Sequence, residues 1–184
     1  MREAIGLIEL TSVGIGYQVQ DVMLKAADVE LVLGRTICSG KYINLVTGSV
    51  AAVAASVEAG LKAAPDGVID HMTIPNVHKN VFQALGQSVQ LTLKTPQAVG
   101  IIETYSVASV LEAADVAVKT ASVTLFRIHT AMALGGKGFL MMAGTVADCR
   151  TGVDAAAEVV RAKGLLVSAV VIPGPSKEIF QEYI

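Results

Sequence analysis

Cys38 is the residue of this sequence with the most distinctive chemistry of its own. It lies in the segment 36–41 (TICSGK), a short turn between two apolar stretches. A cysteine thiolate binds soft metals and iron–sulfur clusters, but a lone cysteine is more often a small buried hydrophobic residue. Because the chain contains no CxxC pair, one copy of Cys38 does not by itself predict a metal cluster.

The other titratable residues give weaker signals. Cys149 shares an apolar helical face with three valines and is expected in the core. Glu9 and Glu103 occupy equivalent places in a repeat, which explains them without acid–base chemistry. Three histidines have no metal-ligand spacing with one another or with acids: His71, His78 and His129. No nucleophile–base–orienter set is present, so we expect no enzyme active site.

A glycine-lysine pair occurs twice, as Gly40-Lys41 and Gly136-Lys137. A phosphate-binding P-loop needs a longer glycine-rich loop and a Ser or Thr after the lysine, and both are missing here. The pairs therefore predict two turns. The second turn contains two adjacent glycines, at 135 and 136, which favour a mobile backbone.

The composition excludes several classes of protein. Hydrophobic residues make up 53% of the chain, charged residues 16%, and the net charge is −2. This is too apolar for disorder and not basic enough for a nucleic-acid-binding protein, and it predicts a surface covered by partner chains. The longest uncharged stretch, 42–57, contains Gly, Ser, Asn and Thr, so we expect no membrane span. The start has no signal-peptide pattern, and two unpaired cysteines suit a reducing cytoplasm.

The hydrophobic pattern predicts a strand–helix–strand–strand–helix–strand unit followed by a short helix. Strands are expected at 4–10, 31–38, 42–46 and 68–74, and helices near 19–27, 50–61 and 77–85. This order indicates a ferredoxin-like α/β (α+β) fold, in which helices flank a four-stranded antiparallel sheet.

The sequence contains this unit twice. AIGLIE at 4–9 returns as AVGIIE at 98–103, and Asp21 with Lys25 returns as Asp115 with Lys119 at the same offset. After the second strand the offset grows by two, so the second turn, near 131–136, is longer and is expected to follow a different path. We predict two tandem domains of one fold, 1–94 and 95–184.

These residues resemble the bacterial microcompartment (BMC) shell-protein domain, over nearly the whole chain. The resemblance is carried by the AIGLIE segment and its echo, the Asp-x-x-x-Lys helices, the glycine-lysine turns, and the Ile-Pro that closes each unit. It implies that three tandem chains form a pseudo-hexameric tile in a microcompartment shell, beside other shell proteins. It also implies that Lys25 and Lys119 lie at the tile edge.

The turn at 36–41 further resembles that of the tandem-domain shell proteins of propanediol-utilisation compartments. In those proteins the cysteine of this turn holds an iron–sulfur cluster at the pore. Three copies of Cys38 around a three-fold axis would supply three ligands to a [4Fe–4S] cluster and leave one iron for a non-protein ligand. A proline expected in the turn is Ser39 here, which removes no ligand.

The resemblance therefore implies a pore and an electron path across the shell, with a redox enzyme of the lumen as a further partner. The expected pore-lining residues are Cys38, Ser39, Gly40, Leu134, Gly135 and Gly136. Two alternatives stay open. One is a tile with a metabolite pore and no cluster. The other is a regulatory tandem ferredoxin-like protein that binds a small molecule and has a buried Cys38.

Overall fold

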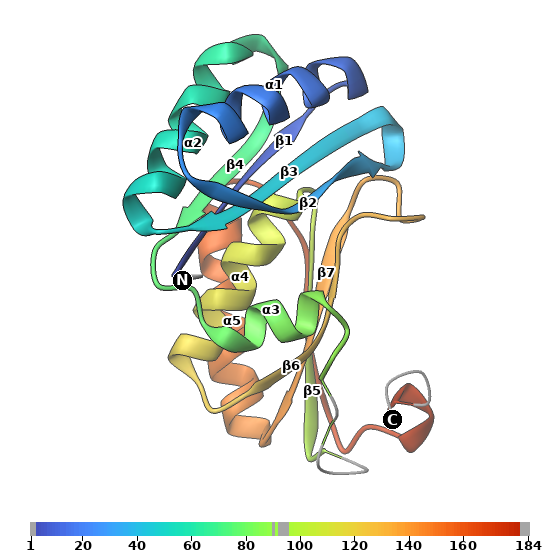
Figure 1. Cartoon of the computed structure of the whole chain (residues 1–184). Helices are drawn as coiled ribbons and strands as arrows, with labels where there is room; N and C mark the ends of the chain where they lie inside the picture. The colour runs from blue at the N-terminus through green and yellow to red at the C-terminus, as the bar shows by residue number, and fades with distance from the viewer. Residues whose placement is uncertain (1–2, 90, 92–95, 181–184) are drawn as a thin grey trace. The chain divides into compact units, whose positions relative to one another are not determined.

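The computed structural model of the chain describes residues 3–89, 91 and 96–180. They form two compact units (Figure 1). Unit 1 holds the described residues within Met1–Val77, together with Ser106–Ser109 and Ala131–Gly136; unit 2 holds those within His78–Tyr105, Val110–Thr130 and Lys137–Ile184. The predicted border between residues 94 and 95 falls outside the described residues.

Unit 1 contains a four-stranded antiparallel sheet in the order β2-β3-β1-β4. Its strands are β1 (Ala4–Leu10), β2 (Val29–Ile37), β3 (Lys41–Gly48) and β4 (Val68–Ile74). Every residue of the inner strand β1 is buried, Glu9 included, which fits its largely apolar sequence. A short 3₁₀ turn, η1 (Cys38–Gly40), joins β2 to β3, and another, η2 (Pro65–Gly67), precedes β4.

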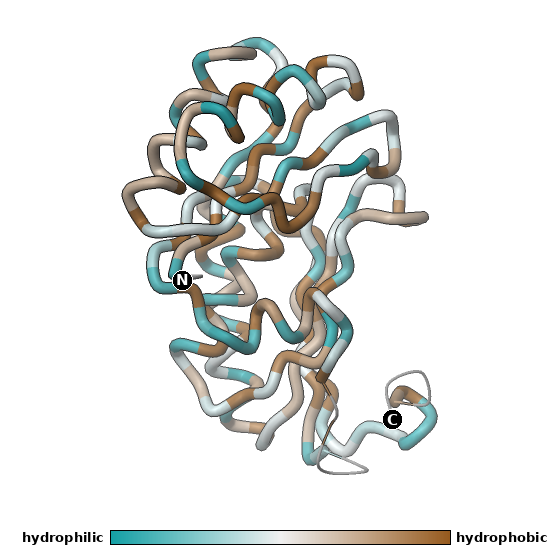
Figure 2. The backbone as a smooth tube through the Cα atoms, viewed as in Figure 1, coloured by the Kyte–Doolittle hydropathy of each residue, from teal (hydrophilic) through white to brown (hydrophobic). Residues whose placement is uncertain are grey.

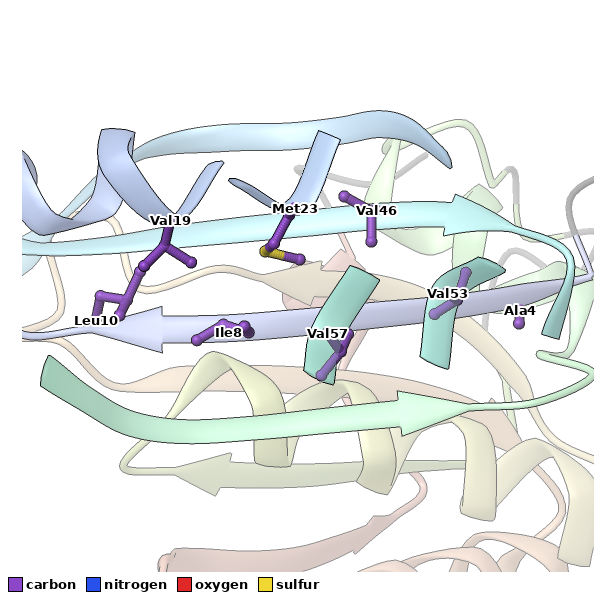
Figure 3. Close-up of a cluster of buried hydrophobic side chains, with 8 residues drawn as sticks. All are labelled: Ala4, Ile8, Leu10, Val19, Met23, Val46, Val53 and Val57. Carbon is purple, nitrogen blue, oxygen red and sulfur yellow. The ribbon is translucent and has the colours of Figure 1, made fainter. Parts of the chain in front are cut away.

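Helices α1 (Val13–Ala26) and α2 (Val50–Ala63) lie side by side on one face of this sheet (Figure 1). Each begins after a serine whose side chain accepts a backbone N–H of the first turn: Ser12 from Ile15 and Ser49 from Ala52. Figure 3 shows the resulting core, in which Met23 of α1 and Val57 of α2 pack with Ile8 of β1.

Unit 2 repeats this sheet in the order β6-β7-β5-β8. Its strands are β5 (Ala98–Thr104), β6 (Thr124–His129), β7 (Gly138–Gly144) and β8 (Leu166–Pro173). The helices are α3 (Lys79–Leu85), α4 (Val107–Thr120) and α5 (Val146–Ala162), followed by a 3₁₀ turn, η3 (Lys177–Phe180). The first residues of α4, up to Ser109, belong to unit 1.

The predicted fold class and element order are confirmed, but the boundaries around the first turn differ. The strand expected at 31–38 is β2, which ends at Ile37, so Cys38 lies just beyond the strand. The chain leaves the extended conformation here because Ser39 and Gly40 have φ of 66° and 70°. This left-handed backbone reverses the chain into β3.

Hydrophobic and hydrophilic stretches alternate along the backbone of both units (Figure 2). This is the pattern expected when each sheet and its helices bury one face. Among the described residues, no helix combines the length and the apolar character needed to cross a membrane.

Candidate functional site

The turn that carries Cys38 is bound to the segment 131–136, and both lie in unit 1. The backbone N–H of Cys38 donates to the carbonyl oxygen of Ala131 at 3.2 Å. The Sγ atom of Cys38 accepts the backbone N–H of Ala133 at 2.9 Å. The segment thus holds the cysteine at its backbone and at its sulfur.

The backbone of 131–136 bends repeatedly through the left-handed region. Ala131, Ala133, Gly135 and Gly136 have φ of 59°, 58°, 62° and 85°. For alanine this conformation costs about 1 kcal/mol per residue, so the rest of the fold must hold it in place. Turns of this kind point successive N–H groups into one concavity, which suits an anion.

The sulfur of Cys38 lies in such a concavity, and this lowers the pKa of the thiol. The backbone N–H of Leu134 makes the largest contribution, desolvation opposes it, and the N–H groups of Ala133, Gly135 and Gly136 add to the lowering. Cys38 is only partly buried. The arrangement favours an accessible thiolate, which is the form that binds metal.

The structure therefore brings together four of the six residues predicted to line a pore. Cys38 lies against Leu134, Gly135 and Gly136, while Ser39 and Gly40 are exposed on the adjoining bend. A Cβ atom on Gly136 would lie 3.5 Å from the carbonyl oxygen of Cys38, which shows how closely the two turns pack. That these residues face a symmetry axis stays a prediction.

The expected difference between the two turns is confirmed. The first is the short 3₁₀ turn Cys38–Gly40, and the second spans 130–137 between β6 and β7. Two residues of the first turn have positive φ, whereas four in the second do. Only the first carries a cysteine, so the two turns are not chemically equivalent.

The lysine after each glycine pairs with a glutamate on a central strand, a contact that the sequence analysis missed. Lys41 Nζ lies 2.9 Å from Glu9 Oε1, and Lys137 Nζ lies 2.6 Å from Glu103 Oε1. Glu9 is fully buried, and desolvation raises its pKa against the opposing effect of Lys41. The bond to Glu103 raises the pKa of Lys137. The signal was available, because glutamate and lysine recur together in both halves.

The Asp and Lys residues that recur in both halves form helical ion pairs, with different exposure. Lys25 and Asp21 lie 2.6 Å apart with both side chains largely exposed. Lys119 and Asp115 lie 2.5 Å apart, and the Asp115 side chain is only 7% exposed. Asp115 also accepts the backbone N–H of His78 at 2.8 Å, which fixes the start of α3. A tile-edge role for the two lysines stays a prediction.

The surroundings of Cys149 and His129 indicate structural roles. Cys149 is fully buried, its Sγ lies 3.6 Å from the carbonyl oxygen of Ala98, and burial raises its pKa, so the predicted core role is confirmed. His129 stacks on Phe139. Within the described part of one chain, no group of three or more His, Cys, Asp or Glu residues is placed to hold a metal ion.

Comparisons with known proteins agree with this architecture. A family model described as the BMC domain matches residues 4–77 and 98–175. The bacterial microcompartment shell protein PduT of Citrobacter freundii is 41% identical over 184 residues, covering 100% of this chain and 99% of PduT. The carboxysome shell protein CsoS1 of Prochlorococcus marinus is 38% identical over 90 residues, covering 47% of this chain and 86% of CsoS1.

Two solved structures share the fold. A microcompartment protein from Desulfitobacterium hafniense superposes with a TM-score of 0.86 at 44% identity, covering 97% of this chain and 98% of the other. The fused permuted hexameric shell protein of the RMM microcompartment gives a TM-score of 0.65 at 21% identity, covering 87% of this chain and 82% of the other. The second match supports the fold alone.

Proposed function

This chain belongs to the BMC-domain family of bacterial microcompartment shell proteins, and from that premise we propose that three copies form a pseudo-hexameric tile whose pore holds a [4Fe–4S] cluster. Cys38 of each copy is the ligand. The tile is a structural part of the shell beside other shell proteins. Three Cys38 thiolates would hold the cluster, which would supply a one-electron carrier between the two sides of the shell for a redox enzyme of the lumen.

The duplication supports the number of copies. The BMC-domain model matches this chain twice, at 4–77 and 98–175, and the match to CsoS1 spans 47% of this chain but 86% of CsoS1. Three chains with two domains each supply six domains, and closed rings are the usual form of soluble homo-oligomers.

The donor set at Cys38 fits the proposed cluster. Its sulfur is partly exposed and its thiolate form is favoured by the N–H groups of 133–136. One chain offers one thiolate there, and its described residues contain no group of three or more side chains placed to hold a metal ion. A cluster therefore requires several copies of Cys38 to meet, and three thiolates leave one iron for a non-protein ligand. When bound, the cluster supplies one-electron redox chemistry.

The residues of this chain have distinct roles in that proposal. Cys38 binds iron through its sulfur. The N–H of Ala133 donates to that sulfur, and hydrogen bonds to ligating sulfurs tune the reduction potential of an iron–sulfur centre. Ser39 and Gly40 form the exposed bend beside it. The observation that carries the proposal is the exposed, hydrogen-bonded sulfur of Cys38 in a chain whose second cysteine is buried.

Anaerobic purification with analysis of iron and acid-labile sulfide tests the proposal. We expect brown protein with several irons per trimer and one cluster for every three chains. A colourless trimer without iron after anaerobic reconstitution would indicate a tile with a metabolite pore. A stable monomer that binds a small molecule would support the regulatory alternative.

A further inference from the structure

The start of α4 shows how this fold binds a helix end. The Glu9 carboxylate accepts the backbone N–H of Val107 at 2.7 Å. The Asp70 carboxylate accepts the hydroxyl groups of Ser106 and of Ser109, the latter at 2.8 Å. All these residues lie in unit 1, and those of the helix start are fully buried. Glu9 thus binds a backbone N–H at the positive end of the helix dipole, and Asp70 binds the serine hydroxyls beside it.

The second repeat contains an equivalent glutamate, and the first repeat contains an equivalent helix start. Glu103 corresponds to Glu9, and Val13 corresponds to Val107 at the same offset. In unit 1, Glu9 is opposite Asp70 in the β1–β4 register, and in unit 2, Glu103 is opposite Ser168 in the β5–β8 register. The carboxylate of Glu103 bonds Lys137 as that of Glu9 bonds Lys41. The other oxygen of Glu103 accepts the hydroxyl of Ser168 at 3.3 Å, and a carboxylate oxygen can accept a helix N–H besides such a bond.

The burial of these equivalent residues differs between the two repeats. The Glu9 side chain is 0% exposed and that of Glu103 is 26% exposed. Val107 is fully buried, whereas its counterpart Val13 is half-buried. Tyr17 on α1 is 60% exposed, whereas its counterpart in α4, Leu111, is buried. A single chain therefore covers the start of α4 but leaves the start of α1 open.

The first turn of α1 also has the right charge for such a contact. It contains no acidic residue, and the leading N–H groups of a helix have no partner within the helix. Ser12 accepts the N–H of Ile15, so a carboxylate can still accept the N–H of Val13. The equivalent helix start receives its carboxylate at Val107 from Glu9.

We infer that Glu103 of one copy binds the backbone N–H of Val13 at the start of α1 in a second copy, repeating the Glu9–Val107 contact between chains. This interface rests on the proposed ring of three copies, and each copy offers one acidic face and one helix start. Such head-to-tail contacts close into a ring when the rotation between neighbouring copies is that of a three-fold axis, as in the proposed tile. The second copy also covers Gly14 and Tyr17, which are exposed in one chain.

The contact between chains has one carboxylate fewer than its template. Ser168 stands where the other repeat has Asp70, and Ile15 stands where it has Ser109. The hydroxyl–carboxylate bonds of the template are therefore lost, and Glu103 is the main charged group of the interface. Removing its charge should weaken the trimer more than any comparable change on the exposed helices.

Glu103→Gln and Glu103→Ala test this assignment, with Glu58→Gln as the matched control. Glu58 is an exposed helical carboxylate paired with Lys62, so its loss changes net charge equally. We measure sedimentation velocity over a dilution series, and hydrogen exchange of the amides at 13–15. We expect both Glu103 variants to dissociate at a protein concentration at least tenfold higher than the parent, with faster exchange at 13–15.

Ser168→Asp provides a gain-of-function variant that does not depend on loss of fold. It restores the second carboxylate of the template, and we expect the trimer to persist to lower protein concentration than the parent. If the parent is a trimer and none of the Glu103 or Ser168 changes alters dissociation or exchange, the interface is wrong and the tile stands. If the parent itself is monomeric at all concentrations, the proposed tile fails and the interface fails with it.

Discussion

The Sγ atom of Cys38 accepts a hydrogen bond from the backbone N–H of Ala133, which lies 95 residues further along the chain. The donor segment belongs to the second copy of the repeat, and its own turn carries no cysteine. The two turns of the repeat thus have separate roles. One presents the sulfur, and the other holds it with backbone N–H groups.

Alkylation of Cys38 should report this arrangement directly. In Cys149→Ser protein without iron, we expect the iodoacetamide rate to rise with pH around a midpoint below 9.0, the ordinary value for a thiol. The reason is that the N–H of Leu134 and its neighbours stabilise the thiolate. Urea-unfolded protein is the control and should show the ordinary midpoint. Equal midpoints in the folded and unfolded protein would contradict the account.

Ala133→Pro should raise the pKa of Cys38 toward its ordinary value. Proline has no N–H and fixes φ near −65°, whereas Ala133 has φ of 58° and donates to the sulfur. Ala133→Gly is the matched control, because glycine keeps the N–H and accepts positive φ. The alkylation profile of the glycine variant should match the parent. A proline variant with an unchanged profile and intact circular dichroism would show that the N–H of Ala133 does not lower the pKa of Cys38.

Lys41→Met should destabilise unit 1 strongly. It leaves the fully buried Glu9 carboxylate without its cation, and breaking a buried ion pair typically costs about 3–5 kcal/mol. Lys62→Met is the control, because its partner Glu58 is exposed, and the expected loss is about 0.5 kcal/mol or less. Urea denaturation midpoints of the two variants provide the measurement, and equal losses would be the contradicting result.

The same variant should show a characteristic pH dependence. Desolvation already raises the folded-state pKa of Glu9 above its ordinary 4.5, and loss of Lys41 raises it further. A raised carboxyl pKa means that the folded state binds the proton more tightly than the unfolded state. The stability deficit of Lys41→Met should therefore be largest at neutral pH and shrink as the pH falls through that raised pKa. A deficit that is constant from pH 7 to pH 5 would argue against a buried charge.

Much of the fold followed from the sequence because local patterns determine it. The first strand of each unit, the helix after it and the Asp–Lys pairs repeat at one offset, and the structure contains them. The Glu9–Lys41 pair and the bonds around Cys38 were missed, because they depend on strand register and on a loop distant in sequence. The short apolar run before Cys38 also gave no exact strand end, since Ser39 adopts positive φ without being glycine.

The double variant Lys25→Ala, Lys119→Ala should leave the trimer intact but weaken the assembly of trimers into two-dimensional arrays. Both lysines make helical i,i+4 pairs. Losing the exposed Lys25–Asp21 pair costs about 0.3–0.5 kcal/mol, whereas Lys119→Ala leaves the buried Asp115 carboxylate without its cation and costs more. Circular dichroism of the double variant must therefore show an intact fold before array formation is compared. Electron microscopy shows whether two-dimensional arrays form, and sedimentation of the same samples shows whether the trimer forms. Lys62→Ala, which also removes a helical pair, is the control and should form arrays normally.

Iron per trimer in Cys38→Ser protein tests the central claim most directly. Parent, Cys38→Ser and Cys149→Ser proteins are reconstituted anaerobically, and iron is measured beside electron paramagnetic resonance of the reduced samples. Because Cys38 is partly exposed and Cys149 is buried, Cys38→Ser should remain a trimer but lose the iron and the signal. Cys149→Ser should keep both, at some cost in stability. If Cys38→Ser retains the iron and the signal of the parent, the cluster is not bound by Cys38 and the proposed electron path loses its ligand.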